Sequence, residues 1–549
     1  MSTGAAHGEG AGERPEGLGL TAAELGLWQA YRTGSWFDMR ERDPGRDDPA
    51  GPQAWGPERT VRAAVIALLL LDGPAAAPGR VAALKLNGAR VTGGLDLSGG
   101  DVRRYLELRN CRFEGEVLLP ECRVTTARFI ACAIPRFEGA RLQVEGDLYL
   151  SRCTVDDGVR LTDARIGADL QISQLAVGAD RRGRAIAADG IMVGHEVTAE
   201  LLQSNGQVSL RGAVIGDSLN LAGSVIRNPY DRWALNAPQL TVFRSFTLTP
   251  TTGPGSGHTR SRDTGGGNFE CHGGLRLDDG LFVEGVDFTG ARFVMDEDQE
   301  IALRRIQTPE LRFTGKRPER GRVVLSGAKV GGLTDTYASW PPPGRLQLEG
   351  FTYEYLIPAD RFPIAERLEW VDATDEYSPQ PYEQLAATLH RSGDHRAARQ
   401  VQRAQQRRLR ADLPRPRRAW EALRDTPGIQ VVLWAGIVMV LLVVAWSSTR
   451  AVLADTGNGA GLAPSDAPPV LVAIVSVITA SGVLVGGILN GLAKFVRARG
   501  QNTSDLVQAR GHADASLIQA QAEMRRAEAD FLRARKGLPP AEPPDLSER

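Results

Sequence analysis

The chain has 549 residues, with 65 Lys and Arg against 66 Asp and Glu, so its net charge is close to zero. This balance excludes a basic field that would recruit nucleic acid. Five cysteines are too few for a disulfide framework in a chain of this length. Residues 1–18 are polar and rich in glycine, without an apolar stretch. We therefore expect a disordered start and no cleaved signal peptide.

Residues 19–80 predict an N-terminal helical cap with a linker. Thr21 precedes a short apolar-periodic run that ends near Tyr31, and we expect it to be the N-cap of a helix. A stretch rich in Pro, Asp and Gly follows at 42–56 and is typical of a linker. Glu58–Leu71 has the apolar density of a helix that covers the first coil of the next domain.

Residues 81–350 repeat an eleven-residue pattern that is apolar at offsets 0, 2, 5 and 7, with a small residue at offset 5. Two successive units are Leu106, Leu108, Cys111, Phe113 and Val117, Leu119, Cys122, Val124. Within each unit, the two apolar residues at offsets 0 and 2 lie on the same face of a strand, and so do those at offsets 5 and 7. The step of three residues between these pairs would reverse the face in a straight strand, so the chain must turn a corner there. Two units of about 22 residues would make one coil, so the pattern predicts a mainly β fold, a right-handed parallel β-helix. A leucine-rich repeat is excluded because eleven residues leave no room for a returning helix.

The coils are interrupted at about 250–268, a Gly-rich stretch that predicts a flexible surface loop. Residues 351–425 predict an exit segment and a basic helical hairpin. Its helices span Tyr382–His390 and Ala397–Arg410, with Gly393 ending the first and Asp394 capping the second. A single hairpin cannot bury both faces, so it must pack on the end of the β-helix or on a partner.

Two stretches without charged residues, 429–446 and 470–493, are long enough to cross a membrane as helices. Both are flanked by arginines, whereas the connection 447–469 carries one Arg and two Asp. The positive-inside rule therefore predicts a multi-pass protein of the cell membrane with both termini in the cytoplasm. Residues 494–549 predict a cytoplasmic helix and tail, and the helix is either a weak coiled coil or a lone solvated helix.

The membrane flanks supply the candidate contact residues. Basic side chains next to the predicted spans attract anionic lipid headgroups, although membrane topology alone would explain them. These are Arg407, Arg408, Arg410, Arg415, Arg417, Arg418, Lys494 and Arg497. Small residues four apart let membrane helices approach closely, whether within this chain or in a homo-oligomer. In the second span they are Gly482, Gly486, Gly487 and Gly491.

No stretch of the sequence carries a catalytic, cofactor-binding or metal-binding pattern. Phosphate-binding and dinucleotide-binding glycine loops, a nucleophile elbow and paired metal-binding histidines are all missing from the sequence. Cys111, Cys122, Cys132 and Cys153 occupy the small-residue offset, where stacked core thiols act as small apolar groups. We therefore predict no catalytic residue, no metal and no cofactor. Basic and acidic residues balance along the rod, which argues against an acidic mimic of DNA.

The order of segments resembles a bacterial family of pentapeptide-repeat-like β-helix membrane proteins. The similar segments are "GPERTVRAAVIALLLLDG" (Gly56–Gly73), the β-helix, "PQPYEQLAATLHRSGDHRAARQVQRAQQRR" (Pro379–Arg408) and the membrane region. Members of this family are often labelled membrane-associated oxidoreductase. The resemblance implies a membrane-associated β-helix and leaves an enzymatic role open, without a reaction or site residues that can be carried over.

These features favour a non-enzymatic, membrane-anchored cytoplasmic scaffold that presents a β-helix rod. Its expected partners are inner-membrane lipid and an unidentified cytoplasmic protein, with no nucleic acid. The alternative is a membrane-associated oxidoreductase or another enzyme, with a site on the β-helix that motif analysis does not find.

Overall fold

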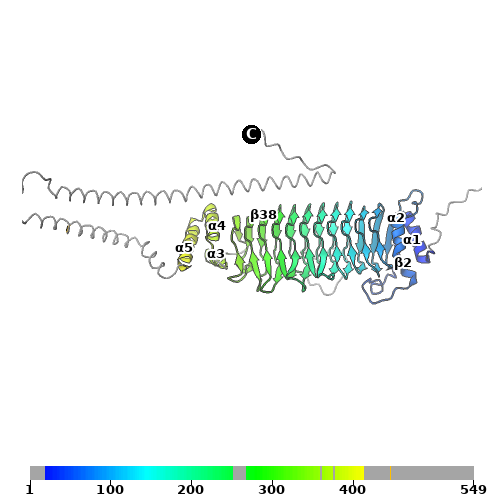
Figure 1. The fold of residues 1–549 in the computed structure, drawn as a ribbon, viewed down its shortest axis with the longest axis horizontal. Helices are drawn as coiled ribbons and strands as arrows, with labels where there is room; N and C mark the ends of the chain where they lie inside the picture. Colours follow the sequence, from blue (N-terminus) through cyan, green and yellow to red (C-terminus); the bar gives the residue numbers. More distant parts are fainter. Residues whose placement is uncertain (1–18, 252–266, 359–361, 375–376, 413–445, 447–549) are drawn as a thin grey trace, which may run out of the picture. The chain divides into compact units, whose positions relative to one another are not determined.

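The computed structural model describes residues 19–251, 267–358, 362–374, 377–412 and 446. The chain divides into two compact units, Met1–Arg408 and Leu409–Arg549, and nearly all of the described residues belong to the first. This unit is mainly β, with long parallel sheets that run through its middle (Figure 1). The described residues also contain five α-helices, two near the N-terminal end of the strands and three after the last strand.

The strands wind in repeated coils, each with four short strands. One coil contains β14 (Gln143–Val144), β15 (Leu148–Tyr149), β16 (Thr154–Val155) and β17 (Val159–Arg160). Each strand pairs in parallel with its counterpart in the next coil, and Leu148 pairs with Leu170, two eleven-residue units further along the chain. This stacking is the arrangement of a parallel β-helix and agrees with the predicted repeat.

The four ladders merge into three sheets. One ladder of ten strands runs from β2 (Thr60–Arg62) to β36 (Arg292–Val294), and one of eleven runs from β5 (Leu95–Asp96) to β41 (Leu346–Gln347). The other two join into a 21-stranded sheet because the long strand β38 (Gln307–Phe313) pairs with both β34 (Leu281–Phe282) and β35 (Gly285–Asp287). Two further long strands, β40 (Lys329–Asp335) and β42 (Thr352–Pro358), complete this sheet.

Many corners of the coils are made by residues in the left-handed backbone conformation, which glycine adopts most easily. Asn110, Glu121, Ala131 and Arg152 have φ between 47° and 59°, and each directly precedes a core cysteine. Side chains larger than glycine carry a strain here that the stacked coils above and below must offset. Corner glycines are therefore not required at every turn, which explains why the sequence repeat looks degenerate.

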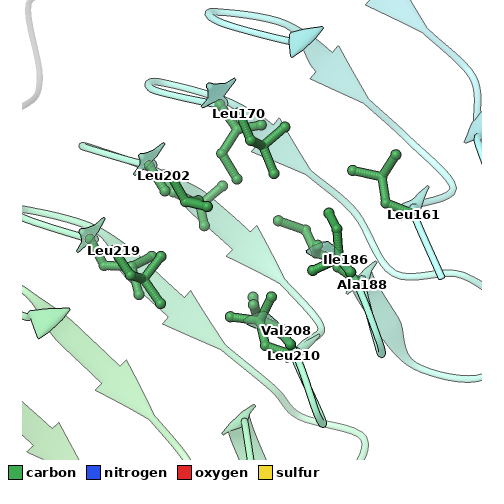
Figure 2. Close-up of a cluster of buried hydrophobic side chains, with 14 of the residues drawn as sticks. Leu161, Leu170, Ile186, Ala188, Leu202, Val208, Leu210 and Leu219 are labelled. Atoms are coloured by element: carbon green, nitrogen blue, oxygen red, sulfur yellow. The ribbon is translucent and has the colours of Figure 1, made fainter. Parts of the chain in front are cut away.

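The interior of the coils is filled by stacked apolar side chains. Figure 2 shows one such cluster, in which Leu170, Leu202 and Leu219 from successive coils face Ile186 and Val208 from the opposite wall. The predicted offsets are confirmed here, since Leu106, Leu108 and Phe113 are all buried. Towards the C-terminal end aromatic rings replace the leucines, and Phe288 packs edge-on against both Phe293 and Phe313.

The N-terminal end of the rod is closed by helices α1 (Ala22–Thr33) and α2 (Ala63–Asp72) (Figure 1). Thr21 is the N-cap of α1, as predicted, and forms a capping box with Glu24. The second predicted helix begins later than expected. Pro57–Arg59 forms a 3₁₀ turn and Thr60–Arg62 forms β2, because this strand starts a ladder by pairing with β4 (Arg90–Thr92).

The segment 42–56, predicted to be a linker, is fastened to the side of the rod. The Arg112 guanidinium donates hydrogen bonds to the backbone carbonyls of Pro49 (2.6 Å), Gln53 (2.5 Å) and Gly51 (2.6 Å). Trp55 lies buried over the same arginine, with 4.9 Å between the guanidinium carbon and the ring centroid. A strand residue thus holds this segment through carbonyl groups, which no sequence pattern reveals.

The C-terminal end is covered by α3 (Ile364–Asp372), α4 (Pro379–Arg391) and α5 (His395–Asp412). Gly393 has φ 85° between α4 and α5, and Asp394 accepts a hydrogen bond from the Ala397 N–H (2.9 Å). The predicted break and cap of the hairpin are therefore confirmed. In the part of the chain that the structure describes, no helix has the length and apolar character needed to cross a membrane. The predicted spans 429–446 and 470–493 fall outside it, apart from Trp446.

Candidate functional site: a groove at the C-terminal end of the rod

A hollow lies where the last strand meets the three C-terminal helices. We call it the C-terminal groove, and it has a volume of about 590 Å³. Glu354, Tyr355, Leu356 and Pro358 of β42 form one wall. The others are Phe362, Pro363, Ile364 and Arg367 around α3, and Thr388, Leu389, Arg391, Ser392, Asp394, Arg396, Ala397 and Gln400 of the hairpin. This size is within the range of ordinary ligand sites.

The strand wall of the groove is a sheet edge. Inward-facing residues of the coils donate their backbone N–H to the following coil, as Leu95 does to Glu116 (2.9 Å) and Leu148 does to Asp169 (3.0 Å). Leu356 takes the same inward position in β42, since it pairs with the buried Leu333. No described strand follows β42, so the N–H and C=O of Leu356 face the groove without a described partner.

The hairpin covers only the first part of this edge. The Tyr353 carbonyl accepts hydrogen bonds from Gln384 Nε2 (2.6 Å) and from an Arg391 guanidinium nitrogen (3.1 Å). These side chains supply the hydrogen-bond donors that the strand of a further coil would otherwise provide. Beyond Tyr353, Tyr355 and Ile357 of β42 are 50% and 43% exposed. The groove is thus the uncovered remainder of the last coil.

A buried ion pair fixes α3 beneath the groove. The Arg367 guanidinium donates to both carboxylate oxygens of Asp335 (2.5 and 2.6 Å), and Trp340 Nε1 donates to one of them (2.8 Å). Asp335 is fully buried and Arg367 nearly so, and the guanidinium also stacks on Phe362. Removing one partner of such a pair is costly because the other is left charged in the interior. The pair therefore locks the wall of the groove in place.

Two buried polar atoms near α3, the Tyr353 hydroxyl and Trp370 Nε1, have no hydrogen-bond partner among the described residues. Burial raises the pKa of the Tyr353 hydroxyl above its usual range, so it stays protonated. Neither residue lines the groove. They add packing under α3, with their ring centroids 6.3 Å apart, and carry no chemistry that the geometry supports.

The charged side chains around the groove are only partly neutralised. Arg391 and Arg396 are exposed, and neither forms an ion pair with a described carboxylate. Asp394 lies between them in sequence, but its carboxylate caps α5. Glu354 on the strand side is exposed and also lacks a described ionic partner. The hairpin side of the groove can therefore accept an anionic group.

The structure describes only some of the predicted membrane-contact residues. Arg407 and Arg408 are exposed on α5, and Arg408 Nε lies 3.9 Å from a carboxylate oxygen of Asp372. Arg410 lies in the same helix. Outside the described residues are Arg415, Arg417, Arg418, Lys494, Arg497, Gly482, Gly486, Gly487 and Gly491. Of these residues, the side chains of Arg407 and Arg408 are described, and neither lines the C-terminal groove.

Four cysteines, Cys111, Cys122, Cys132 and Cys153, lie in the core, as predicted. Cys271 is buried too, and all five are free. Cys132 links two coils, because its N–H contacts Cys153 Sγ (3.4 Å) while its thiol points at the Leu108 carbonyl (3.4 Å). Burial raises the pKa of Cys111 and Cys132 well above the usual value, and that of Cys122 to about 11. Such thiols stay protonated and are poor nucleophiles and ligands. Across the described ranges, no group of three or more His, Cys, Asp and Glu could hold a metal ion.

Sequence reasoning missed α3 and the groove. The stretch 364–371 does carry a helical signal, with apolar Ile364, Leu368 and Val371 at spacings of four and three after Pro363. The free edge has no signal of its own, because β42 reads like any other strand. Its exposure depends on where the chain stops coiling.

Comparisons of the chain with protein-family models, with curated proteins and with solved structures found no match. The resemblance to pentapeptide-repeat-like membrane proteins therefore stays a prediction from the sequence.

Proposed function

We propose that the protein is a membrane-anchored cytoplasmic scaffold that binds another protein at the C-terminal end of a right-handed β-helix rod. The observation that carries this proposal is the C-terminal groove, in which an uncovered strand edge lies beside an apolar floor and exposed arginines. A rigid rod that ends in such a groove holds a binding surface in a fixed orientation. Open strand edges are also among the commonest places at which proteins pair with other chains.

The membrane anchor is supported by the sequence. The stretches 429–446 and 470–493 are free of charged residues and follow the basic helix α5 closely. Exposed Arg407 would lie on the cytoplasmic side and attract anionic lipid under the positive-inside rule. The anchor would restrict the rod to the membrane surface, which raises its effective concentration towards partners held there.

The test combines topology with purification from membranes. We expect a cysteine at Ser465 to react with a membrane-impermeant maleimide in intact cells, and a cysteine at Ser504 to react only after lysis. The five native cysteines give little background because the rod buries them all. Full-length protein purified in detergent should then be examined for absorbance above 300 nm and for bound metal.

Two outcomes would overturn this proposal. The reverse labelling pattern would place the rod outside the cytoplasm. A stoichiometric chromophore or metal in the purified protein would favour the alternative, a membrane-associated oxidoreductase or another enzyme with its site on the β-helix.

A further inference from the structure

We infer that the C-terminal groove binds an extended peptide, which adds one strand to the free edge of β42 and places a carboxylate beside Arg391 and Arg396. This inference rests on the proposed binding function and specifies the chemistry of the partner. It follows from the direction of backbone groups, from the shape of the groove and from its charge.

The backbone of β42 offers hydrogen bonds that only another strand can use fully. Leu356 presents one N–H and one C=O to the groove, which is the pair that an adjoining strand residue exchanges. Pro358 occupies the next inward position, since it pairs with Asp335, and it has no N–H to leave unpaired. The free edge is thus short. A peptide of a few residues can reach its two unpaired backbone groups, the N–H and C=O of Leu356.

The other walls of the groove favour a single extended chain. Side chains of α4 already occupy the edge at Tyr353, so the rod cannot be continued there by a complete coil. An extended peptide instead lies along β42 and alternates its side chains between solvent and the apolar floor of Phe362, Ile364 and Leu389.

The charges select an acidic side chain over a basic one. Arg391 and Arg396 lie at the hairpin turn without an ionic partner among the described carboxylates. One guanidinium nitrogen of Arg391 already donates to the Tyr353 carbonyl and the Thr388 hydroxyl. Charge-assisted hydrogen bonds to a carboxylate can therefore come from Arg396 and from the other nitrogens of Arg391. Glu354 lies on the opposite wall and lowers the affinity for the same peptide. The two walls therefore make opposite contributions, which can be tested separately.

The first experiment uses full-length protein in detergent and a fluorescein-labelled octapeptide, Val-Thr-Val-Asp-Val-Thr-Val-Asp, with both ends blocked. We expect saturable binding by fluorescence anisotropy. Replacing both Asp by Lys should weaken binding at least tenfold. Two further peptides carry N-methyl groups on alternate residues, one on the odd positions and one on the even positions. Only one edge of an added strand faces β42, so one methylated peptide should lose binding at least tenfold and the other should keep it.

The second experiment changes the protein. Arg396→Gln should weaken binding of the acidic octapeptide about tenfold, and Glu354→Gln should strengthen it two- to threefold. Arg399→Gln is the matched control, since Arg399 is exposed on the same helix and does not line the groove. The affinity of the Arg399→Gln variant for the acidic octapeptide should equal that of the unchanged protein.

The outcomes separate this inference from the proposed scaffold. Equal binding by both methylated peptides, or equal effects of Arg396→Gln and Arg399→Gln, would overturn strand addition. Absence of binding by every octapeptide would overturn it as well. The scaffold function would still stand if labelling of the cysteines at 465 and 504 followed the expected pattern and a protein partner bound elsewhere on the rod.

Discussion

Outward-facing residues of the rod differ more in burial than the repeat suggests. On β7 (Tyr105–Arg109) the inward Leu108 is fully buried, as the pattern predicts. The same pattern places Glu107 outward and predicts that its replacement has little effect. The structure corrects this expectation, since Glu107 is only 3% exposed and accepts hydrogen bonds from Tyr105 (2.5 Å) and Arg109 (2.6 Å). Trp36 from the N-terminal segment stacks over Arg109, with 4.8 Å between the guanidinium carbon and the ring centroid.

This difference predicts a graded series of stabilities. Leu108→Asp should lower the free energy of unfolding by more than about 4 kcal/mol, because an unpaired charge would enter the core. Glu107→Ala should cost about 1–3 kcal/mol, because Tyr105 and Arg109 lose a partially buried acceptor. The control Glu116→Ala, at an exposed position, should change stability by less than about 0.5 kcal/mol. Urea unfolding of the three variants measures the series, and similar effects of Glu107→Ala and Glu116→Ala would contradict it.

Among the elements, α1 is joined to the rod by a buried carboxylate as well as by its apolar side chains. Glu24 is completely buried, caps α1 through the Thr21 N–H (2.9 Å), and accepts hydrogen bonds from the backbone and guanidinium of Arg62. Burial alone would raise its pKa, but these hydrogen bonds and the positive charge outweigh burial and lower the pKa from 4.5 to about 2. The residue therefore ties the helical cap to strand β2.

The lowered pKa predicts acid sensitivity of this junction. The folded protein keeps Glu24 charged at pH values where the unfolded chain protonates it. The resulting stabilisation, about 3 kcal/mol, is fully present above pH 4.5 and is lost as the pH falls towards 2. Glu24→Gln should be less stable at pH 7, and the difference from the unchanged protein should shrink across this window. Urea midpoints at pH 7, 4 and 3 check this, and a constant difference would contradict it.

At the scale of the whole molecule, the described unit contains its own core. Stacked side chains from neighbouring coils fill the interior, α1 and α2 close one end, and α3 closes the other through the Asp335–Arg367 pair. We therefore expect its stability to require the C-terminal helices but not the predicted spans.

Two truncations test this. A chain that ends at Asp412 should fold and unfold cooperatively, because every described coil and helix is kept. A chain that ends at Pro358 should lose α3 and the hairpin, which exposes Trp340 and Tyr353 and leaves Asp335 charged and unpaired. We expect this shorter chain to aggregate or to unfold at a clearly lower temperature. Indistinguishable thermal melts of the two chains would show that the helices do not close the rod.

The sequence by itself determined the elements whose signals are local or periodic. The eleven-residue pattern specifies the strands and their inward faces, because each coil repeats the packing of the last. The cap at Thr21 and the break at Gly393 follow from turn and capping chemistry within a few residues. Only the tertiary structure decided the contacts between residues far apart in the chain. Asp335 meets Arg367, and Arg112 holds the carbonyls of the segment 42–56. The C-terminal groove was also decided by the tertiary structure. A strand edge becomes a site only where the chain stops coiling. The helices that follow must also leave part of that edge uncovered.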